Sequence, residues 1–168
     1  MLITETERLR IREMDSAFDA EFVFALLNSP KFLQYIGDRN VRSVEQAADF
    51  IETRYRQSYR DHGYGLYTVE LQDGTYLGMC GFVKRPQFNL PDLGFAFLPE
   101  HERKGYGFES ATAMLGNGRD VLGFSRVYAI TSQDNDASGK LLEKLGFRFN
   151  GIEEMPDGEQ LKVFSITL

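Results

Sequence analysis

Two glycines and two basic residues lie together in the segment Arg103-Lys104-Gly105-Tyr106-Gly107, between an apolar run and a helical pattern. Glycine lets a backbone turn tightly and approach a ligand, and the first turn of a helix presents free N–H groups that favour an anion. The segment therefore predicts a phosphate-binding turn. An ordinary strand–helix turn with two solvated bases is the alternative, because short glycine motifs have many chance matches. The pattern is neither a Walker motif nor a dinucleotide-binding fingerprint, since the residues that define each are missing.

A second polar pair, Asn135 and Ser138, follows about thirty residues later, in the order typical of a helix start. Asn135 can cap a helix that Gly146 ends, and both polar residues are expected to face the mouth shared with the preceding strand–helix unit. Taken alone, this segment is a capped amphipathic helix. Its predicted buried side consists of Ala137, Leu141, Leu142 and Leu145.

A sheet is needed to position both segments, and the hydrophobic pattern predicts its strands. Extended patterns cover residues 9–12, 66–71, 76–83, 92–98, 127–131, 147–149 and 161–168. Asp73-Gly74 indicates a hairpin between the second and third of these runs. About four helices are predicted: one after Asp15 or Ser16, one from Ser43 to Gly63, one from Phe108, and one after Asn135. We therefore expect an α/β fold with a mixed sheet, antiparallel early and with a parallel pair late.

The first two predicted helices have recognisable signals. Asn28-Ser29-Pro30 should end the first helix, whose expected core face comprises Phe18, Phe22, Ala25 and Leu26. Ser43-Val44-Glu45-Gln46 has the pattern of a capping box at the start of the second. The expected buried face of this helix comprises Val44, Ala47, Ala48, Ile51 and Tyr55.

Composition limits the classes of function. The chain of 168 residues is 42% hydrophobic and fits one domain over residues 1–168, without an internal repeat or linker. A net charge of −6 argues against direct nucleic-acid binding, and one cysteine, Cys80, with two histidines argues against disulfide or metal chemistry. No signal peptide or membrane-spanning run is present, so we expect a cytoplasmic protein without membrane contact.

Taken together, the segments resemble the GCN5-related N-acetyltransferase (GNAT) superfamily, in particular the branch of ribosomal-protein N-terminal acetyltransferases. The order and spacing of the segments over nearly the whole chain carry this resemblance. The segments are residues 6–12, residues 65–69, Leu93-Gly94-Phe95-Ala96-Phe97-Leu98-Pro99-Glu100-His101, Lys104-Gly105-Tyr106-Gly107, Asn135-Asp136-Ala137-Ser138 and Leu142-Glu143-Lys144-Leu145-Gly146-Phe147.

The resemblance implies acetyl-CoA as co-substrate, bound where the family's fourth and fifth strands, here 92–98 and 127–131, splay apart. The pantetheine arm would pair with the backbone around Phe97 and Leu98. An N–H within Phe95, Ala96 and Phe97 would polarise the thioester carbonyl. The pyrophosphate would lie on the amides of Arg103, Lys104, Gly105, Tyr106, Gly107 and Phe108.

The resemblance also implies catalytic roles for direct attack of an amine on the thioester. Ser138 is the candidate proton donor to the CoA thiolate, and Asn135 would orient the cofactor or a water. Asp92 is the best candidate for a general base, with Glu70 and Glu109 as weaker candidates, while a solvated strand-start acid is the plainer reading of Asp92. No metal is needed.

Two positions depart from the family pattern. Glu102 occupies a position that usually holds Gln or Arg, so an acid would face the pyrophosphate unless it turns away. Leu142 occupies the position at which many relatives have a tyrosine acid. Three readings therefore stay open: acetylation of a protein N-terminus, acetylation of a small amine, and a non-catalytic acyl-CoA-binding module.

The acceptor side is less defined by sequence. Residues 32–60 should form the wall that sets acceptor specificity. Tyr35, Tyr64 and Tyr67 could line an acceptor pocket, although a place in the core or at its rim is the default for each. The chain could act as a monomer or as a homodimer.

Overall fold

The computed structural model describes residues 1–168 and contains one mixed eight-stranded sheet. Its strand order is β1-β2-β3-β4-β5-β6-β8-β7, and every neighbouring pair is antiparallel except β5 and β6. The expected mixed sheet with a late parallel pair is confirmed. The strands are β1 (Leu2–Glu5), β2 (Leu9–Arg12), β3 (Leu66–Leu71), β4 (Tyr76–Val83), β5 (Asp92–Phe97), β6 (Arg126–Ser132), β7 (Arg148–Glu154) and β8 (Gln160–Thr167).

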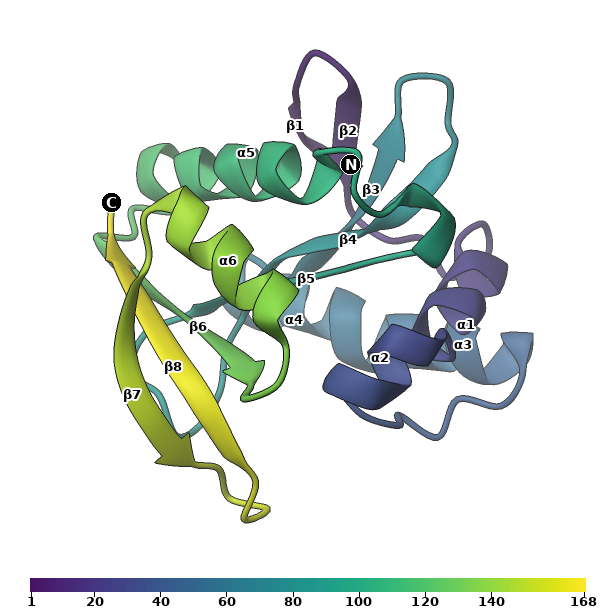
Figure 1. Cartoon of the computed structure of the whole chain (residues 1–168). Coiled ribbons are helices and arrows are strands. Elements are labelled where there is room, and N and C mark those ends of the chain that lie inside the picture. The colour runs from purple at the N-terminus through teal and green to yellow at the C-terminus, as the bar shows by residue number, and fades with distance from the viewer.

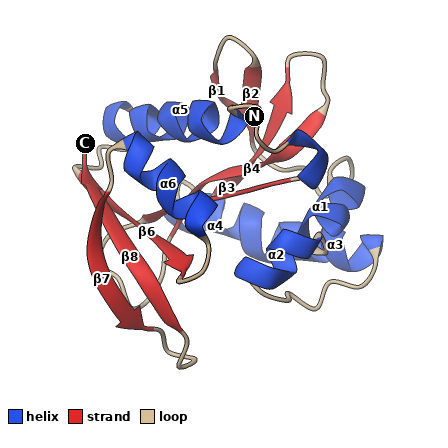
Figure 2. Cartoon of the chain, viewed as in Figure 1, coloured by secondary structure: helices blue, strands red, loops and turns tan.

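Helices lie on both sides of this sheet (Figure 1). Figure 2 shows α5 and α6 together on one side and α1 to α4 grouped on the other. The longest helix, α5, has 15 residues, and no helix is long and apolar enough to cross a membrane. The helical elements are α1 (Ala20–Leu27), α2 (Pro30–Tyr35), α3 (Val44–Phe50), the π-helix η1 (Ile51–Arg56), α4 (Gln57–His62), the 3-10 helix η2 (Pro99–His101), α5 (Tyr106–Asp120) and α6 (Asp136–Leu145).

The two faces of the sheet bury separate cores. On β5, Leu93 belongs to the cluster beneath α5 and α6, whereas Ala96 packs against the cluster formed with α1 to α3. This division follows from the alternation of side chains along a strand. Both clusters consist of apolar side chains removed from water, and their burial holds the helices on each face.

The parallel strands β5 and β6 separate soon after they meet. They pair only at Asp92 and Tyr128, where the Tyr128 N–H donates to the Pro91 carbonyl at 3.0 Å. Beyond this point β5 stays with β4 and β6 stays with β8 (Figure 1). The predicted splay of these two strands is therefore confirmed, and it leaves one edge of β5 unpaired.

The register of β5 determines which backbone groups face the gap. The Leu98 N–H donates to the Leu77 carbonyl at 2.8 Å, so it points toward β4. Backbone groups alternate in direction along an antiparallel strand. The amides of Phe97 and Phe95 therefore point away from β4, into the space between β5 and β6.

The predicted helix signals act largely as expected. The Ser43 hydroxyl accepts from the Gln46 N–H at 3.1 Å, and the Gln46 side chain accepts from the Arg42 N–H rather than from Ser43. Asn135 caps α6, and Gly146 ends it in the left-handed conformation. Local sequence therefore predicts where these helices begin and end.

Some sequence expectations are wrong. Phe18 is 79% exposed because it lies in a turn before α1, where the Asp15 carboxylate accepts its N–H at 2.8 Å. Outside the helix, its spacing to Phe22 no longer places it on the core face. Pro30, expected only to end a helix, also begins α2, since a proline at the first position loses no helical hydrogen bond. The exposed residues that were expected to be buried also include Ala25, Val44 and Ala137.

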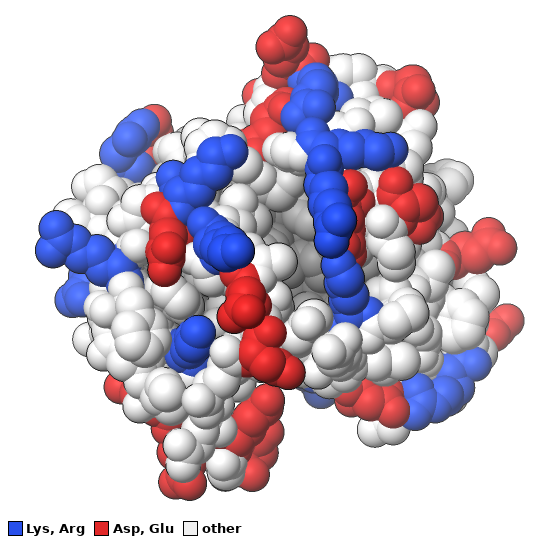
Figure 3. Space-filling view, viewed as in Figure 1, with Lys and Arg blue, Asp and Glu red and all other residues white.

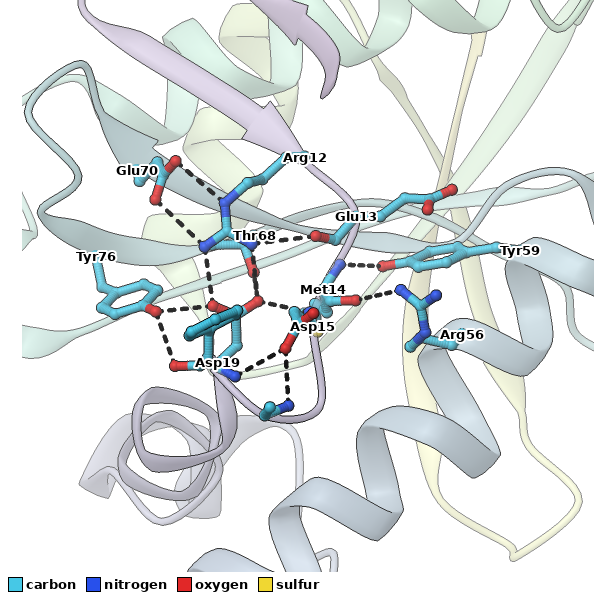
Figure 4. Close-up of polar contacts among 12 residues, drawn as sticks. Arg12, Glu13, Met14, Asp15, Asp19, Arg56, Tyr59, Thr68, Glu70 and Tyr76 are labelled. Atoms are coloured by element: carbon cyan, nitrogen blue, oxygen red, sulfur yellow. Dashed lines mark hydrogen bonds and ion pairs between the residues drawn. The ribbon is translucent and has the colours of Figure 1, made fainter. Parts of the chain in front are cut away.

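A buried polar cluster fixes the first strands to the start of α1 (Figure 4). The Arg12 guanidinium donates to both Asp19 oxygens, at 2.8 and 2.9 Å, and to Glu70 at 3.1 Å. The Tyr76 hydroxyl donates to Asp19 at 2.8 Å. The Asp19 side chain is 0% exposed, so its charge depends on these partners.

Candidate active site

A cleft of about 820 Å³ opens where β5 and β6 separate. Its walls are the ends of β4 to β6, the helical segment from α2 to α4, α6, and the β7–β8 hairpin. Figure 3 shows the corresponding hollow, bordered on one side by a column of basic residues and on the other by acidic residues. The cleft brings together four residues singled out from sequence, Asp92, Phe95, Asn135 and Ser138.

Asp92 is buried, not solvated. Its side chain is 2% exposed, and both carboxylate oxygens lie 3.1 Å from Nε of Arg85. Burial raises the pKa of Asp92 to about 6, and the positive charge of Arg85 only partly offsets this rise. A carboxylate with such a pKa is largely ionised at neutral pH and can still accept a proton.

The other two carboxylates considered from sequence lie outside the cleft. Glu70 accepts from Arg12 in the buried cluster of Figure 4. Glu109 accepts from Arg8 at 2.7 Å and from the Thr6 hydroxyl, and these hydrogen bonds lower its pKa although burial acts in the opposite direction. Both acids have structural partners, so Asp92 is the carboxylate of the three that faces the cleft.

Ser138 and Asn135 lie at the start of α6, on the opposite side of the gap from β5. The Asn135 side chain accepts from the Ser138 N–H at 3.2 Å, so its amide oxygen serves as the helix cap. The Ser138 hydroxyl has no hydrogen-bond partner within the chain and lines the cleft. It can therefore donate to a ligand.

Thr131 is a cleft residue that sequence reasoning missed. It is 7% exposed, and its Oγ1 atom is fully buried without a hydrogen-bond partner. Burying an unpaired hydroxyl is costly, so Thr131 stands out among the residues that line the cleft. In the sequence it is only one threonine of a strand, and the strand pattern gave no signal for it.

The glycine turn has the geometry of an anion site. Gly105 has φ +84° and Arg103 has φ +62°, and α5 begins directly afterwards at Tyr106. The first intrahelical bond runs from Glu109 N–H to the Gly105 carbonyl at 3.1 Å. The amides of the three preceding residues are therefore free of helical partners. These amides belong to Tyr106, Gly107 and Phe108.

Two contacts that were not predicted hold this turn. Nη1 of Arg8 donates to the Lys104 carbonyl at 3.1 Å, and its guanidinium lies 4.6 Å from the centre of the Tyr106 ring. Glu102, the acid at the unusual position, forms an ion pair with Lys31 of α2. The Glu102 charge is thus compensated within the protein, which reduces its repulsion of an anion bound at the turn.

The turn is not part of the cleft lining and instead follows the far end of β5, beyond η2. A ligand that spans both places would run along the unpaired edge of β5, with its anionic part at the turn. An extended chain carrying amide groups can pair with such an edge as an added strand. The described geometry therefore fits a long molecule with a phosphate at one end and a reactive group near Asp92 and Ser138.

Part of the segment 32–60, which the sequence predicts to be an acceptor wall, lines the cleft. Phe32, Tyr35 and Tyr55 line the cleft, together with His62 at the end of α4. Tyr64 and Tyr67 are instead buried in the main core, 9% and 3% exposed, which confirms a place in the core for these two.

Comparisons with known proteins agree with this geometry. A family model described as an acetyltransferase (GNAT) domain matches residues 8–148. The chain is 34% identical over 152 residues to an uncharacterized N-acetyltransferase, YoaA, of Bacillus subtilis, covering 89% of this chain and 85% of that protein.

Solved structures show the same fold. A GNAT-family acetyltransferase from Bacillus anthracis is 25% identical, with a TM-score of 0.79 and coverage of 99% of this chain and 98% of that one. RimL, a ribosomal L7/L12 alpha-N-protein acetyltransferase solved with coenzyme A, has a TM-score of 0.85 at 16% identity, covering 100% and 98% of the two chains. At that identity the likeness to RimL extends to the fold alone.

Proposed function

The chain belongs to the GNAT family of N-acetyltransferases, and on this premise we propose that it transfers the acetyl group of acetyl-CoA to a protein N-terminal amine. The observation that carries the proposal is the unpaired edge of β5, which joins the anion-binding turn to a cleft containing Asp92 and Ser138. Family members use acetyl-CoA, and RimL binds coenzyme A in a structure of this fold.

Acetyl-CoA would lie along β5. The backbone groups of Phe97 and Phe95 are available to the pantetheine amides, whereas the Leu98 N–H already donates to Leu77. The backbone groups of Ala96 point toward β4, so Ala96 would lie beside acetyl-CoA without a hydrogen bond to it. The pyrophosphate would accept from the free amides at the start of α5, with charge supplied by Arg103 and Lys104.

The chemistry is direct transfer. The neutral amine attacks the thioester carbon, a C–N bond forms, and the Phe95 N–H stabilises the oxyanion. Asp92, directly or through one water, accepts the proton that the amine loses. The C–S bond then breaks, and Ser138 protonates the departing thiolate and recovers its proton from solvent. The products are an N-acetyl amide and free coenzyme A.

Thr131 adds a second hydroxyl to the same region. Because its Oγ1 atom is buried and unpaired, a hydrogen bond to the bound thioester or thiolate would satisfy it. Asn135 positions Ser138 by capping α6. We therefore assign Asn135 and Thr131 supporting roles beside Ser138.

Two other readings of the sequence carry less support. A small amine would be served by the same chemistry; the peptide reading is favoured because RimL, a protein of this fold, is a ribosomal L7/L12 alpha-N-protein acetyltransferase. A non-catalytic module was suggested by Glu102 and Leu142. Lys31 compensates the charge of Glu102, and the cleft that Leu142 lines also contains the free hydroxyl of Ser138 as an alternative proton donor.

The experiment that tests the proposal measures release of the CoA thiol with a panel of N-terminal peptides, polyamines and amino acids. Mass spectrometry of the peptides locates the acetyl group. Acetylation at the peptide α-amine, with one thiol released for each amide formed, is the expected result. Release with polyamines alone would replace the peptide assignment by the small-amine reading.

A further inference from the structure

Two arginines in the acceptor part of the cleft have no partner in the chain. Arg39 and Arg54 both line the cleft, and neither guanidinium forms an ion pair or a side-chain hydrogen bond. Most other arginines are matched to a carboxylate. The matched arginines are Arg8, Arg10, Arg12, Arg42, Arg56, Arg60, Arg85 and Arg119.

Aromatic rings hold both guanidinium groups over the cleft. Arg39 lies 5.9 Å from the centre of the Phe32 ring, and Arg54 lies 5.3 Å from the centre of the Phe50 ring. Both rings line the same cleft. A guanidinium that stacks on an aromatic face keeps its N–H groups free for a carboxylate, which it can bind in a two-pronged manner.

Tyr55 lines the same cleft as both arginines. Tyr55 is 8% exposed, lines the cleft, and its hydroxyl has no hydrogen-bond partner in the chain. Burial raises the pKa of Tyr55, and the positive charges of Arg39 and Arg54 act in the opposite direction. Its hydroxyl adds a third hydrogen-bond donor to the lining of the same cleft.

An unusual helical turn places two of these groups. Arg54 and Tyr55 belong to the π-helix Ile51–Arg56, a rare conformation that often marks functional sites. The opposite side of this segment is anchored to the loop after β2 (Figure 4). There Arg56 donates to the Met14 carbonyl at 2.7 Å, and the Tyr59 hydroxyl accepts from the Met14 N–H at 3.1 Å.

Acidic residues border the cleft elsewhere. Asp157 and Glu159, in the β7–β8 connection, line it, as does buried Asp92. The helical wall also holds Asp61, and Lys84 and Arg85 line the cleft after β4, so charges of both signs surround it, which suits an acceptor with an amine and an anionic group.

From this arrangement we infer that the acceptor carries a carboxylate close to its reacting amine, and that Arg39, Arg54 and Tyr55 bind this carboxylate. The inference rests on the proposed acetyl transfer, whose acceptor site it specifies, and a free amino acid as the source of the carboxylate would replace the peptide N-terminus as acceptor. The carboxylate could come from Asp or Glu early in a peptide, or from the α-carboxylate of a free amino acid. Both sources present the same chemistry to the two arginines.

The first test compares matched acceptors by CoA thiol release. A peptide beginning Ser-Asp-Glu is compared with one beginning Ser-Asn-Gln, and free serine is compared with serinamide. In one of the two pairs, we expect the acceptor with the carboxylate to have a KM at least about tenfold lower than its neutral partner. Charge-assisted hydrogen bonds are strong enough to give a difference of this size. Which pair shows the difference identifies the source of the carboxylate.

Variants then connect this preference to the two arginines. Arg39→Gln and Arg54→Gln should each raise the KM for the acidic acceptor about tenfold, so that the ratio of KM between the acidic and the neutral partner falls toward one. Arg39→Lys and Arg54→Lys should retain part of the preference, because they keep the charge. Arg60→Gln is the matched control, since Arg60 lies in the same helical wall, is paired with Glu52 and does not line the cleft.

A binding measurement separates this inference from the proposed function. Calorimetry compares the N-acetylated forms of the two peptides, and of serine and serinamide, as ligands of the CoA-loaded protein. If the carboxylate form binds more tightly than the neutral form, and this difference disappears in Arg39→Gln, the inference is supported whether or not any amine is acetylated. A lack of acetylation would overturn the proposed function alone. Equal KM values and equal affinities for the acidic and neutral partners would overturn the inference. Acetylation of either peptide would still uphold the proposed function.

Discussion

The Lys31 ammonium pairs with the Glu102 carboxylate, and this contact joins the acceptor-side helix α2 to the turn before α5. An acid at this position would otherwise repel the pyrophosphate. The lysine lies 71 positions earlier in the chain, so the compensation is visible only in the folded protein. The pair connects the part of the protein that faces the acceptor with the part expected to bind the cofactor.

Removing this compensation should weaken acetyl-CoA binding. In Lys31→Met, the Glu102 charge is left without its partner, and we expect the Kd for acetyl-CoA to rise several-fold by calorimetry. Glu102→Gln alone should bind at least as tightly as the wild type. The double variant should regain near wild-type affinity, and an unchanged Kd in Lys31→Met would show that the pair does not serve the cofactor site.

The pH profile of the reaction should reveal Asp92. A free peptide amine titrates near pH 7.7–8.0, so log(kcat/KM) should fall with a slope of about one below that range. Because the pKa of Asp92 is raised to about 6, the slope should steepen to about two below pH 6 as the base becomes protonated. Kinetic assays between about pH 5 and pH 9 cover both the region of slope one and the region of slope two.

A substitution of Arg85 tests whether Asp92 produces the lower inflection of the pH profile. The positive charge of Arg85 lowers the pKa of Asp92, so Arg85→Gln should move the lower inflection upward by about one unit or more. Asp92→Asn should lose the second limb and most of kcat. If the lower inflection stays in place in Arg85→Gln, a group other than Asp92 produces it.

Ser138 and Thr131 should affect the leaving-group step. Ser138→Ala should lower kcat by about 10²-fold, the lower range for loss of one general acid, with little change in the Kd for acetyl-CoA. Thr131→Val keeps the shape but removes the unpaired hydroxyl, so kcat/KM should fall while Thr131→Ser retains activity. A thioester with a more acidic thiol should restore part of the Ser138→Ala rate, because it needs less protonation. Equal defects with both thioesters would remove Ser138 from this step.

The Arg12 cluster should contribute to stability. Arg12→Ala leaves buried Asp19 without its main partner, and we expect a loss of about 3 kcal/mol in urea unfolding, at the low end for a buried pair because Arg12 is one-fifth exposed. Arg42→Ala, which breaks the exposed pair with Asp38, is the control and should leave the unfolding free energy near the wild-type value.

The same cluster makes stability dependent on acid. Burial acts to raise the pKa of Asp19, but hydrogen bonds from Arg12, Asp15 and Tyr76 outweigh burial and lower it below 3.8. A lowered folded-state pKa stabilises the protein above the unfolded value, and this stability is lost as pH falls through the folded value. The free energy of unfolding should be measured from pH 5 downward, starting about one unit above the pKa of Asp19 in the unfolded chain. It should fall less with decreasing pH in Arg12→Ala than in the wild type.

Much of the fold followed from local sequence. Asn135, Gly146 and Ser43 act at helix ends as their types predict, and Gly105 adopts the positive φ that the anion-binding turn requires. The short elements were missed. Strand β1 has only four residues, and its pairing with β2 depends on the fold more than on any pattern of its own.

The site was less predictable because its partners are distant in sequence. Spacing could place Asp92 on β5, but its burial and its contact with Arg85 set the pKa, and neither follows from the residue type. The unpaired hydroxyl of Thr131 likewise depends on what surrounds it in the fold. The free arginines of the acceptor wall stand out only because other arginines have carboxylate partners.

We propose that the cleft between β5 and β6 transfers an acetyl group from acetyl-CoA to an amine. The most direct measurement combines thiol release with mass spectrometry of a peptide acceptor, for the wild type and Ser138→Ala. The account predicts one acetylated α-amine for each thiol released, at a rate reduced about 10²-fold in the variant. Tight acetyl-CoA binding without acetylation of any peptide or small amine would contradict it.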